Sequence, residues 1–316
     1  MKYQSFVGAI LVLLRICNVS GIPMTNHSDN LRGAFFMSLA MAGFVLNDTF
    51  VKLVSDEVPL FQAVLIRGIM VSTMLAGVAL YRGVLSVKLP RKDWNVVVFR
   101  TIGEIGATFC FLTALFHMPI ANISAIMQAL PLAVTLVAAT FFGVKVGWRR
   151  YGAIGIGFIG VLIIIRPGTS DFNFYTLWVI GAVGFVVLRD LSTTRLSSSA
   201  PSSYVALVAS AAMTLVAGAI VLTQEWQPVS GRSLAFLAMS AGFLLIGYLA
   251  AVAAMRIGEI AFVSPFRYSV MIWAIIIGLV VFGDKIEFWT YVGTAIVVGM
   301  GIYTFYREGQ IARRKG

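Results

Sequence analysis

The chain has 316 residues, of which 59% are hydrophobic and only 12% are charged. Soluble domains are about 45–50% apolar and about 25% charged, so an aqueous globular fold is excluded and the surrounding solvent must be lipid. The formal net charge of +11 does not indicate a nucleic-acid partner, because the lysines and arginines flank apolar stretches and form no single basic patch.

Residues 1–30 are predicted to form a leader that precedes the first spanning helix. Lys2 and an apolar run over residues 6–16 resemble a short signal peptide, but the run is too short to span a bilayer. Two interpretations stay open: Met24 is the biological start and residues 1–23 are an extension, or a signal is cleaved. Cleavage is disfavoured because it would leave the new N-terminus outside, against the charge distribution described below.

Ten long apolar stretches follow the leader, most of them close to the length of about 20 residues that a spanning helix needs. The chain is therefore predicted to be an all-α polytopic membrane protein with ten transmembrane helices. The predicted spans are 33–53, 61–81, 95–116, 120–142, 150–166, 174–192, 204–224, 233–254, 260–282 and 288–306.

The last five apolar stretches repeat the first five. This predicts two five-helix domains, at residues 31–168 and 172–307, followed by a basic cytoplasmic tail at 308–316. A unit with an odd number of crossings ends on the side opposite its start, so its copy must lie inverted in the membrane, as in many secondary transporters. The matching residues are Asp48, Pro59, Ala121, Ser124, Phe142, Gly143, Lys145 and Tyr151 with Asp190, Pro201, Ala261, Ser264, Phe282, Gly283, Lys285 and Tyr291.

Basic residues predict the orientation of the chain. Far more lysines and arginines lie in the segments on the side of the N-terminus than in the segments on the other side. Because excess positive charge marks the cytoplasmic side, both termini are predicted to be cytoplasmic, in a multi-pass protein of a bacterial inner membrane.

No pattern in the chain indicates an enzyme, a cofactor or a metal. The two cysteines, Cys17 and Cys110, and the two histidines, His27 and His117, have no metal-ligand spacing. The sequence Gly155-Ile-Gly157-Phe-Ile-Gly160 fits a dinucleotide-binding pattern, but it lies inside a predicted span with no strand before it. Close helix packing through these glycines is the favoured interpretation.

Ionisable side chains in the spans are candidates for function, because each costs about 2.5–3.5 kcal/mol on insertion scales. Asp48, Arg67 and Asp190 are predicted to serve coupling or gating, whereas Glu104 and Arg267 are predicted to line a cavity and bind substrate. Arg100 lies one helical turn before Glu104 and would share its face. Alternatively, pairs such as Arg67–Asp48 and Arg267–Asp190 only tie helices together, or the arginines reach the interface.

The fourth and ninth spans mix polar and aromatic residues around prolines. Gln128 comes shortly before Pro131, which removes a backbone hydrogen bond and frees a carbonyl. Tyr268 follows Arg267 in the ninth span, and Tyr248 lies in the eighth. Gln128, Tyr248 and Tyr268 complete the predicted substrate-binding set, with interface anchoring or core packing as the alternative for the two tyrosines.

Residues 31–306 resemble the EamA branch of the drug/metabolite transporter superfamily. The resemblance rests on the two five-helix halves and on their endings, Pro131…Phe142-Gly143-Val144-Lys145…Gly152…Gly160 and Gly283-Asp284-Lys285…Gly293…Gly301. It implies a central cavity lined mainly by helices 3, 4, 8 and 9, with parts of 1 and 6, and alternating access without ATP. The family often has a glutamate after the helix-4 glycine; here Val144 replaces it and only Asp284 keeps an acid, so the resemblance implies no shared role for an acid at this turn.

Residues 42–52 look most like those of vitamin-uptake members of the family, including riboflavin transporters. Uptake of a small metabolite, with riboflavin favoured, is therefore the leading functional prediction, and its partners are a small-molecule solute and the lipid bilayer. Export of amino acids or drugs is the first alternative, and an intramembrane enzyme or receptor is a remote one. The sequence leaves open whether the protein works as a homodimer.

Overall fold

The fold is described from a computed structural model, which covers residues 27–84, 89–142, 147–167, 172–197, 200–257 and 260–313. Within these ranges every regular element is a helix, which confirms the predicted all-α class. Most of the predicted leader, residues 143–146, which carry part of the motif that resembles the EamA branch, and the end of the basic tail lie outside the described residues.

The described helices follow the predicted apolar stretches in order. They are α2 (His27–Lys52), α3 (Leu60–Tyr81), α4 (Arg91–His117), α5 (Ile120–Met127), α6 (Leu130–Phe141), α7 (Trp148–Ile165), α8 (Thr176–Thr193), α9 (Ser202–Val221), α10 (Gly231–Ile257), α11 (Ile260–Val263), the 3₁₀ helix η1 (Ser264–Tyr268), α12 (Ser269–Val281) and α13 (Phe288–Arg313). Nine candidate spans in the described residues are long and apolar enough to cross a membrane, and the apolar part of α13, Phe288–Thr304, is shorter.

Two of the predicted spans are broken near their prolines. The fourth divides into α5 and α6 around Gln128, because Pro131 has no N–H to bond the carbonyl four residues earlier. The ninth divides into α11, η1 and α12, with Pro265 in the first turn of η1. A proline in a first turn is tolerated, so the 3₁₀ segment begins there without the loss of a helical bond at that residue.

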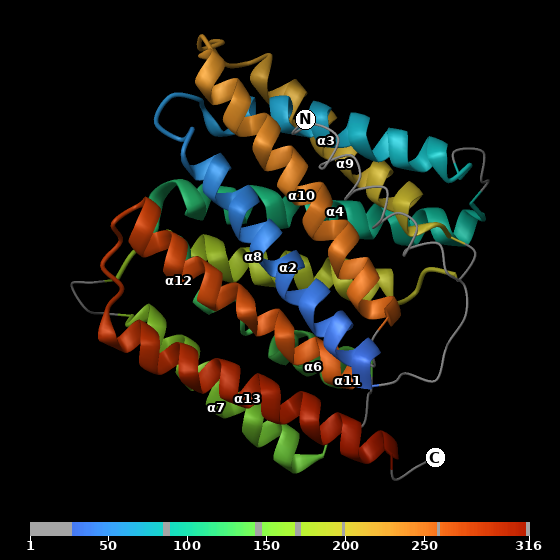
Figure 1. The fold of residues 1–316 in the computed structure, drawn as a ribbon, viewed down its shortest axis with the longest axis vertical. Helices are drawn as coiled ribbons and strands as arrows, with labels where there is room; N and C mark the ends of the chain where they lie inside the picture. Colours follow the sequence, from blue (N-terminus) through green and yellow to red (C-terminus); the bar gives the residue numbers. More distant parts are fainter. Residues whose placement is uncertain are drawn as a thin grey trace.

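The helices pack in pairs that join the first half of the chain to the second. Helix α2 packs on α10, α4 on α8, α3 on α9 and α7 on α13. In Figure 1, α3 and α9 lie along one edge of the bundle and α7 and α13 along the opposite edge, with the other helices between them. The pairs that will hold the candidate site, α2–α10 and α4–α8, therefore lie away from both edges.

Glycines bring the paired helices into close contact. A Cβ placed on Gly160 of α7 would lie 3.0 Å from the carbonyl oxygen of Gly293 on α13, and one on Gly157 would clash with Leu132. Helix packing is thus confirmed for two of the three glycines of the dinucleotide-like pattern, whereas Gly155 has no neighbour within 4 Å of such a Cβ.

Candidate functional site

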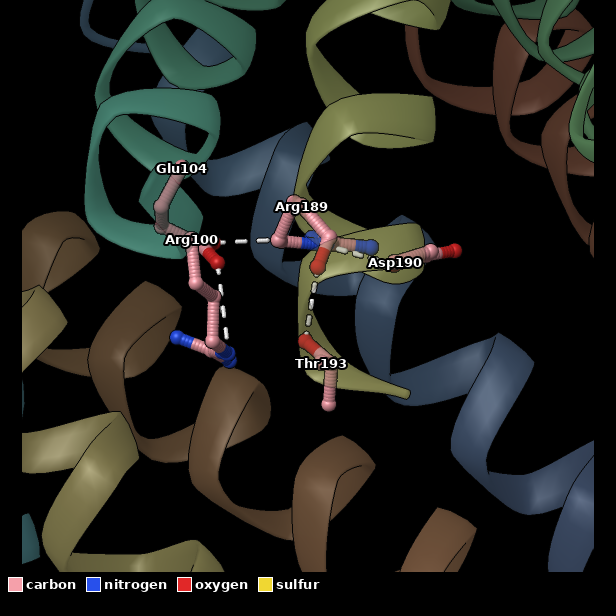
Figure 2. A network of polar contacts seen from close by, with 5 residues as sticks. All are labelled: Arg100, Glu104, Arg189, Asp190 and Thr193. Atoms are coloured by element: carbon pink, nitrogen blue, oxygen red, sulfur yellow. Dashed lines mark hydrogen bonds and ion pairs between the residues drawn. The ribbon is translucent and has the colours of Figure 1, made fainter. Parts of the chain in front are cut away.

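A network of charged side chains joins α4 to α8. Glu104 lies between two arginines: Arg100 Nη2 is 3.8 Å from its Oε2, and Arg189 Nη1 is 3.5 Å from its Oε1. Arg189 also donates from Nε to Asp190 Oδ1 at 2.9 Å. Figure 2 shows Arg189 between the two carboxylates, with Glu104 and Arg100 facing it from α4. Each acid in this network is therefore matched by an arginine.

Small residues on α4 explain why Arg189 reaches Glu104. A Cβ on Gly103 would lie 2.8 Å from the backbone nitrogen of Arg189 and 2.8 Å from the carbonyl oxygen of Phe185. The backbone of α8 thus passes directly over Gly103, where any other residue would hold the two helices apart. The predicted Arg100–Glu104 pair is confirmed, and its i,i+4 spacing places both side chains on the face that meets α8.

A second polar cluster joins α2, α3 and α10. The side-chain oxygen of Asn47 accepts a hydrogen bond from Arg67 Nη1 at 3.2 Å and one from Ser240 Oγ at 2.7 Å. Its Nδ2 donates to Asp48 Oδ1 at 2.8 Å. Arg67 is close enough to interact electrostatically with both Asp48 and Glu104. The guanidinium of Arg67 therefore connects this cluster to the charged network on α4 and α8.

Four of the predicted functional residues are thus brought together: Asp48, Arg67, Glu104 and Asp190, the last through Arg189. Asp190 pairs with its neighbour Arg189 and not with Arg267. Three residues of these clusters, Arg189, Asn47 and Ser240, were not predicted as site residues. Arg189 and Asn47 could have been predicted, because each directly precedes a predicted acid in the sequence. No comparable pattern in the sequence indicates a role for Ser240.

Gln128 and Tyr268 meet at the breaks of their two spans. Gln128 is buried, and its Nε2 donates to the carbonyl oxygen of Tyr268 at 3.5 Å. The ring of Tyr268 is buried against α13, because a Cβ on Gly301 would collide with its hydroxyl. These two residues therefore join the broken spans to each other and lie apart from the charged network.

The remaining two predicted residues lie elsewhere. Tyr248 packs against the apolar cluster that α10 forms with Val71 and Leu75 of α3. Arg267 lies in η1 and is exposed, and among the described residues no carboxylate lies within ion-pair distance of it.

Polar contacts also tie the halves together at both ends of the bundle. At one end the carboxylate of Asp93, the third residue of α4, accepts hydrogen bonds from Ser197 N at 3.3 Å and Ser197 Oγ at 2.5 Å, just after α8. At the other, Glu57, just after α2, accepts hydrogen bonds from Ser230 Oγ at 3.0 Å and from Ser233 Oγ. Ser233 is the third residue of α10.

These two contacts lie at opposite ends of α4. Lys52 Nζ at the end of α2 donates to the carbonyl oxygen of Met118, directly after α4, so the end of α4 lies on the side of Glu57. Asp93 is near the other end of this 27-residue helix, which is about 40 Å long. The hydrogen bonds from Ser233 and Ser230 lower the pKa of Glu57, which keeps this carboxylate charged.

The described residues hold no group of three or more metal-ligating side chains. They do form an apolar pocket of about 430 Å³ between η1, α12 and α13, lined by Tyr268, Ser269 and Thr294 among others. None of the residues that line this pocket belongs to the charged network.

Part of the chain is similar to a known family of membrane transporters. Residues 31–166 match the EamA-like transporter family. An S-adenosylmethionine uptake transporter of Rickettsia felis is 24% identical over 90% of this chain and 96% of its own length. A riboflavin transporter of Vibrio cholerae is 26% identical over 73% of this chain and 77% of its own.

A solved structure supports the fold. It is 19% identical in sequence, covers 84% of this chain and 97% of its own, and superposes with a TM-score of 0.57. Together with the apolar helices, the matches identify a multi-pass membrane protein and a transporter, as the sequence predicted, and not an enzyme. The match to the EamA-like transporter family covers residues 31–166, in the first half of the chain.

Proposed function

We propose that the protein is a secondary transporter that takes up a small organic metabolite across a bacterial inner membrane by alternating access. The observation that carries this proposal is the charged network among apolar helices. Ionisable groups in spanning helices are costly and mark solute or ion pathways. Here Arg67, Glu104, Arg189 and Asp190 come from both halves of the chain and meet between them.

The helix pairing supports ten spans arranged as two inverted repeats. In the predicted correspondence of the two halves, α2 is equivalent to α8 and α4 is equivalent to α10, so the contact α2–α10 is equivalent to the contact α8–α4. The other two contacts, α3–α9 and α7–α13, each join a helix to its own equivalent. Gln128 and Tyr268, which meet at the two broken spans, are equivalent positions in the same correspondence. Discontinuous helices at the interface of two repeats are a recurrent feature of binding sites in secondary transporters.

The contacts at the two ends support alternating access. Opening the bundle at one end requires Asp93 to leave Ser197, whereas opening it at the other requires Glu57 to leave Ser230 and Ser233. Each contact joins one helix of each half and lies at only one end. Rocking one half against the other therefore breaks one contact while it keeps the other.

Riboflavin is the first substrate that we propose, because the sequence favoured it and a riboflavin transporter is among the relatives. S-adenosylmethionine is the second, because the relative named for its uptake matches a larger share of this chain. Both contain a planar heteroaromatic ring system to which polar groups are attached. The hydrogen-bonding groups of Arg67, Asn47 and Arg100 suit the polar part of either.

The test is uptake by proteoliposomes and by an auxotrophic cell that expresses the full chain. We expect one labelled solute, riboflavin or S-adenosylmethionine first, to enter and be recovered chemically unchanged, and growth of the auxotroph to be rescued. Movement only out of the cell would replace uptake by export. Chemical conversion, or no movement of any vitamin, nucleoside or amino acid by correctly inserted protein, would overturn the proposal.

A further inference from the structure

Arg267 stands outside the central network of charged side chains. The three acids of the network region, Asp48, Glu104 and Asp190, lie beside three arginines, Arg67, Arg100 and Arg189. By contrast, no described carboxylate lies within ion-pair distance of Arg267.

Arg267 lies well inside its span. The four-residue helix α11 and most of η1 precede it, and the 13-residue helix α12, about 20 Å long, follows it. The hydrocarbon core is about 30 Å thick, so the backbone of Arg267 falls within it. A guanidinium at this depth needs water, a cavity or an anion around it.

The segments on either side of Arg267 pack against the first half of the chain. Val263 lies four residues before Arg267, and Val270 lies three residues after it. Both valines belong to the apolar cluster that includes Met37 and Met41 of α2, and Trp273 joins the same cluster. Arg267 itself is exposed and is not part of this cluster.

We propose that Arg267 binds a carboxylate of the transported solute. This inference rests on the proposed transport function and narrows its substrate class. A planar guanidinium presents two parallel N–H groups that match the two oxygens of a carboxylate. Among the two solutes proposed above, S-adenosylmethionine carries a carboxylate and riboflavin does not.

The experiment measures uptake and binding by the full chain with matched pairs of probes. The probes are S-adenosylmethionine and the twenty amino acids, each paired with its decarboxylated amine, together with riboflavin. Uptake is measured in proteoliposomes, and binding is measured by thermal stabilisation of the purified protein. Arg267→Gln removes the charge, Arg267→Lys keeps it without the planar fork, and Arg232→Gln, at the start of α10, is the control arginine.

We expect the wild type to prefer at least one carboxylate-bearing probe over its amine by tenfold or more. Arg267→Gln should lose that preference at unchanged membrane abundance, Arg267→Lys should keep part of it, and Arg232→Gln should keep all of it. Preference that survives Arg267→Gln, or uptake of riboflavin alone by wild type and variant alike, would overturn the inference. Binding that depends on Arg267 without any transport would instead reject the transport function and leave the anion site standing.

Discussion

The helix pairs α2–α10 and α4–α8 share one construction and differ in their chemistry. Both have a glycine where the helices touch, a polar contact between the two helices and a serine–carboxylate contact at one end. In α2–α10 the contact between the helices is the neutral hydrogen bond between Ser240 and Asn47. In α4–α8 it is the ion pair of Glu104 and Arg189. The same packing therefore supports a neutral contact in one pair and an ion pair in the other.

The ends of the two pairs differ in the same way. On α4 the third residue is the acid, Asp93, and it is buried, with 3% of its surface exposed. On α10 the third residue is the serine, Ser233, and the acid is Glu57 in the exposed segment after α2. The acid therefore lies on the helix in one pair and the serine lies on the helix in the other. As a result Glu57 is accessible to water, whereas Asp93 is buried. The two ends should therefore respond differently to substitution.

The largest effect is expected from filling the helix contact of α4–α8. Gly103→Ala would place a methyl group 2.8 Å from backbone atoms of Arg189 and Phe185, which cannot rotate away. Overpacking of this kind costs about 1–3 kcal/mol, so the unfolding temperature in detergent should fall. Gly43→Ala in α2–α10, where the nearest atoms are 3.1 Å away, should cost less. Gly184→Ala, with nothing within 4 Å, is the control, and an equal loss there would refute this account of the contact.

The next effect concerns transport. Glu104→Gln leaves Arg100 without its carboxylate and leaves Arg189 with Asp190 alone. We expect the rate of solute uptake to fall about tenfold or more, equivalent to about 1.4 kcal/mol, while the amount of protein in the membrane stays near normal. Uptake close to that of the wild type would remove Glu104 from the site.

The sequence predicted those parts of the site that lie within one helix. The apolar stretches located the helices, Pro131 located a break, and the spacing of Arg100 and Glu104 predicted their pairing. These features depend on neighbours three or four residues away along the chain. Local patterns therefore sufficed for them.

Contacts between helices were beyond the sequence. Arg189 meets Glu104 because α8 passes over Gly103, and Tyr268 is buried because Gly301 leaves room for its ring on α13. Nothing in a single sequence states which glycine faces which helix. For the same reason Asp190 was considered a partner of Arg267, whereas its nearest arginine is its own neighbour.

A smaller effect is expected at the hydrogen bond between Ser240 and Asn47 in α2–α10. Ser240→Ala removes the 2.7 Å hydrogen bond to Asn47 but leaves the bond that Asn47 accepts from Arg67. Because the oxygen of Asn47 keeps a donor, the cost should be about 0.5–1.5 kcal/mol of unfolding free energy. In an Asn47→Ala background the same substitution should cost almost nothing. Additive losses in this double-mutant cycle would show that Ser240 acts through another partner.

The smallest effect is expected at Glu57, and its sign depends on pH. The hydrogen bonds from Ser233 and Ser230 lower the pKa of Glu57 in the folded protein. A lowered pKa contributes stability that is present above the pKa of the unfolded state and is lost as the pH falls through the folded value. Glu57→Gln should therefore lower the unfolding temperature slightly at neutral pH. The difference from the wild type should shrink as the pH falls below the ordinary range of a glutamate.

Asp56→Asn is the matched control, because it removes the neighbouring negative charge and leaves the contact with Ser233 intact. Thermal unfolding of both variants between neutral pH and about pH 3 separates the hydrogen bond from a general effect of net charge, since the unfolded glutamate titrates near 4.3. Equal pH profiles for the two variants would mean that the loss of one negative charge, and not the loss of the hydrogen bonds from Ser230 and Ser233, explains the effect on stability. A profile specific to Glu57→Gln would establish that the contact of Glu57 with Ser230 and Ser233 weakens in acid.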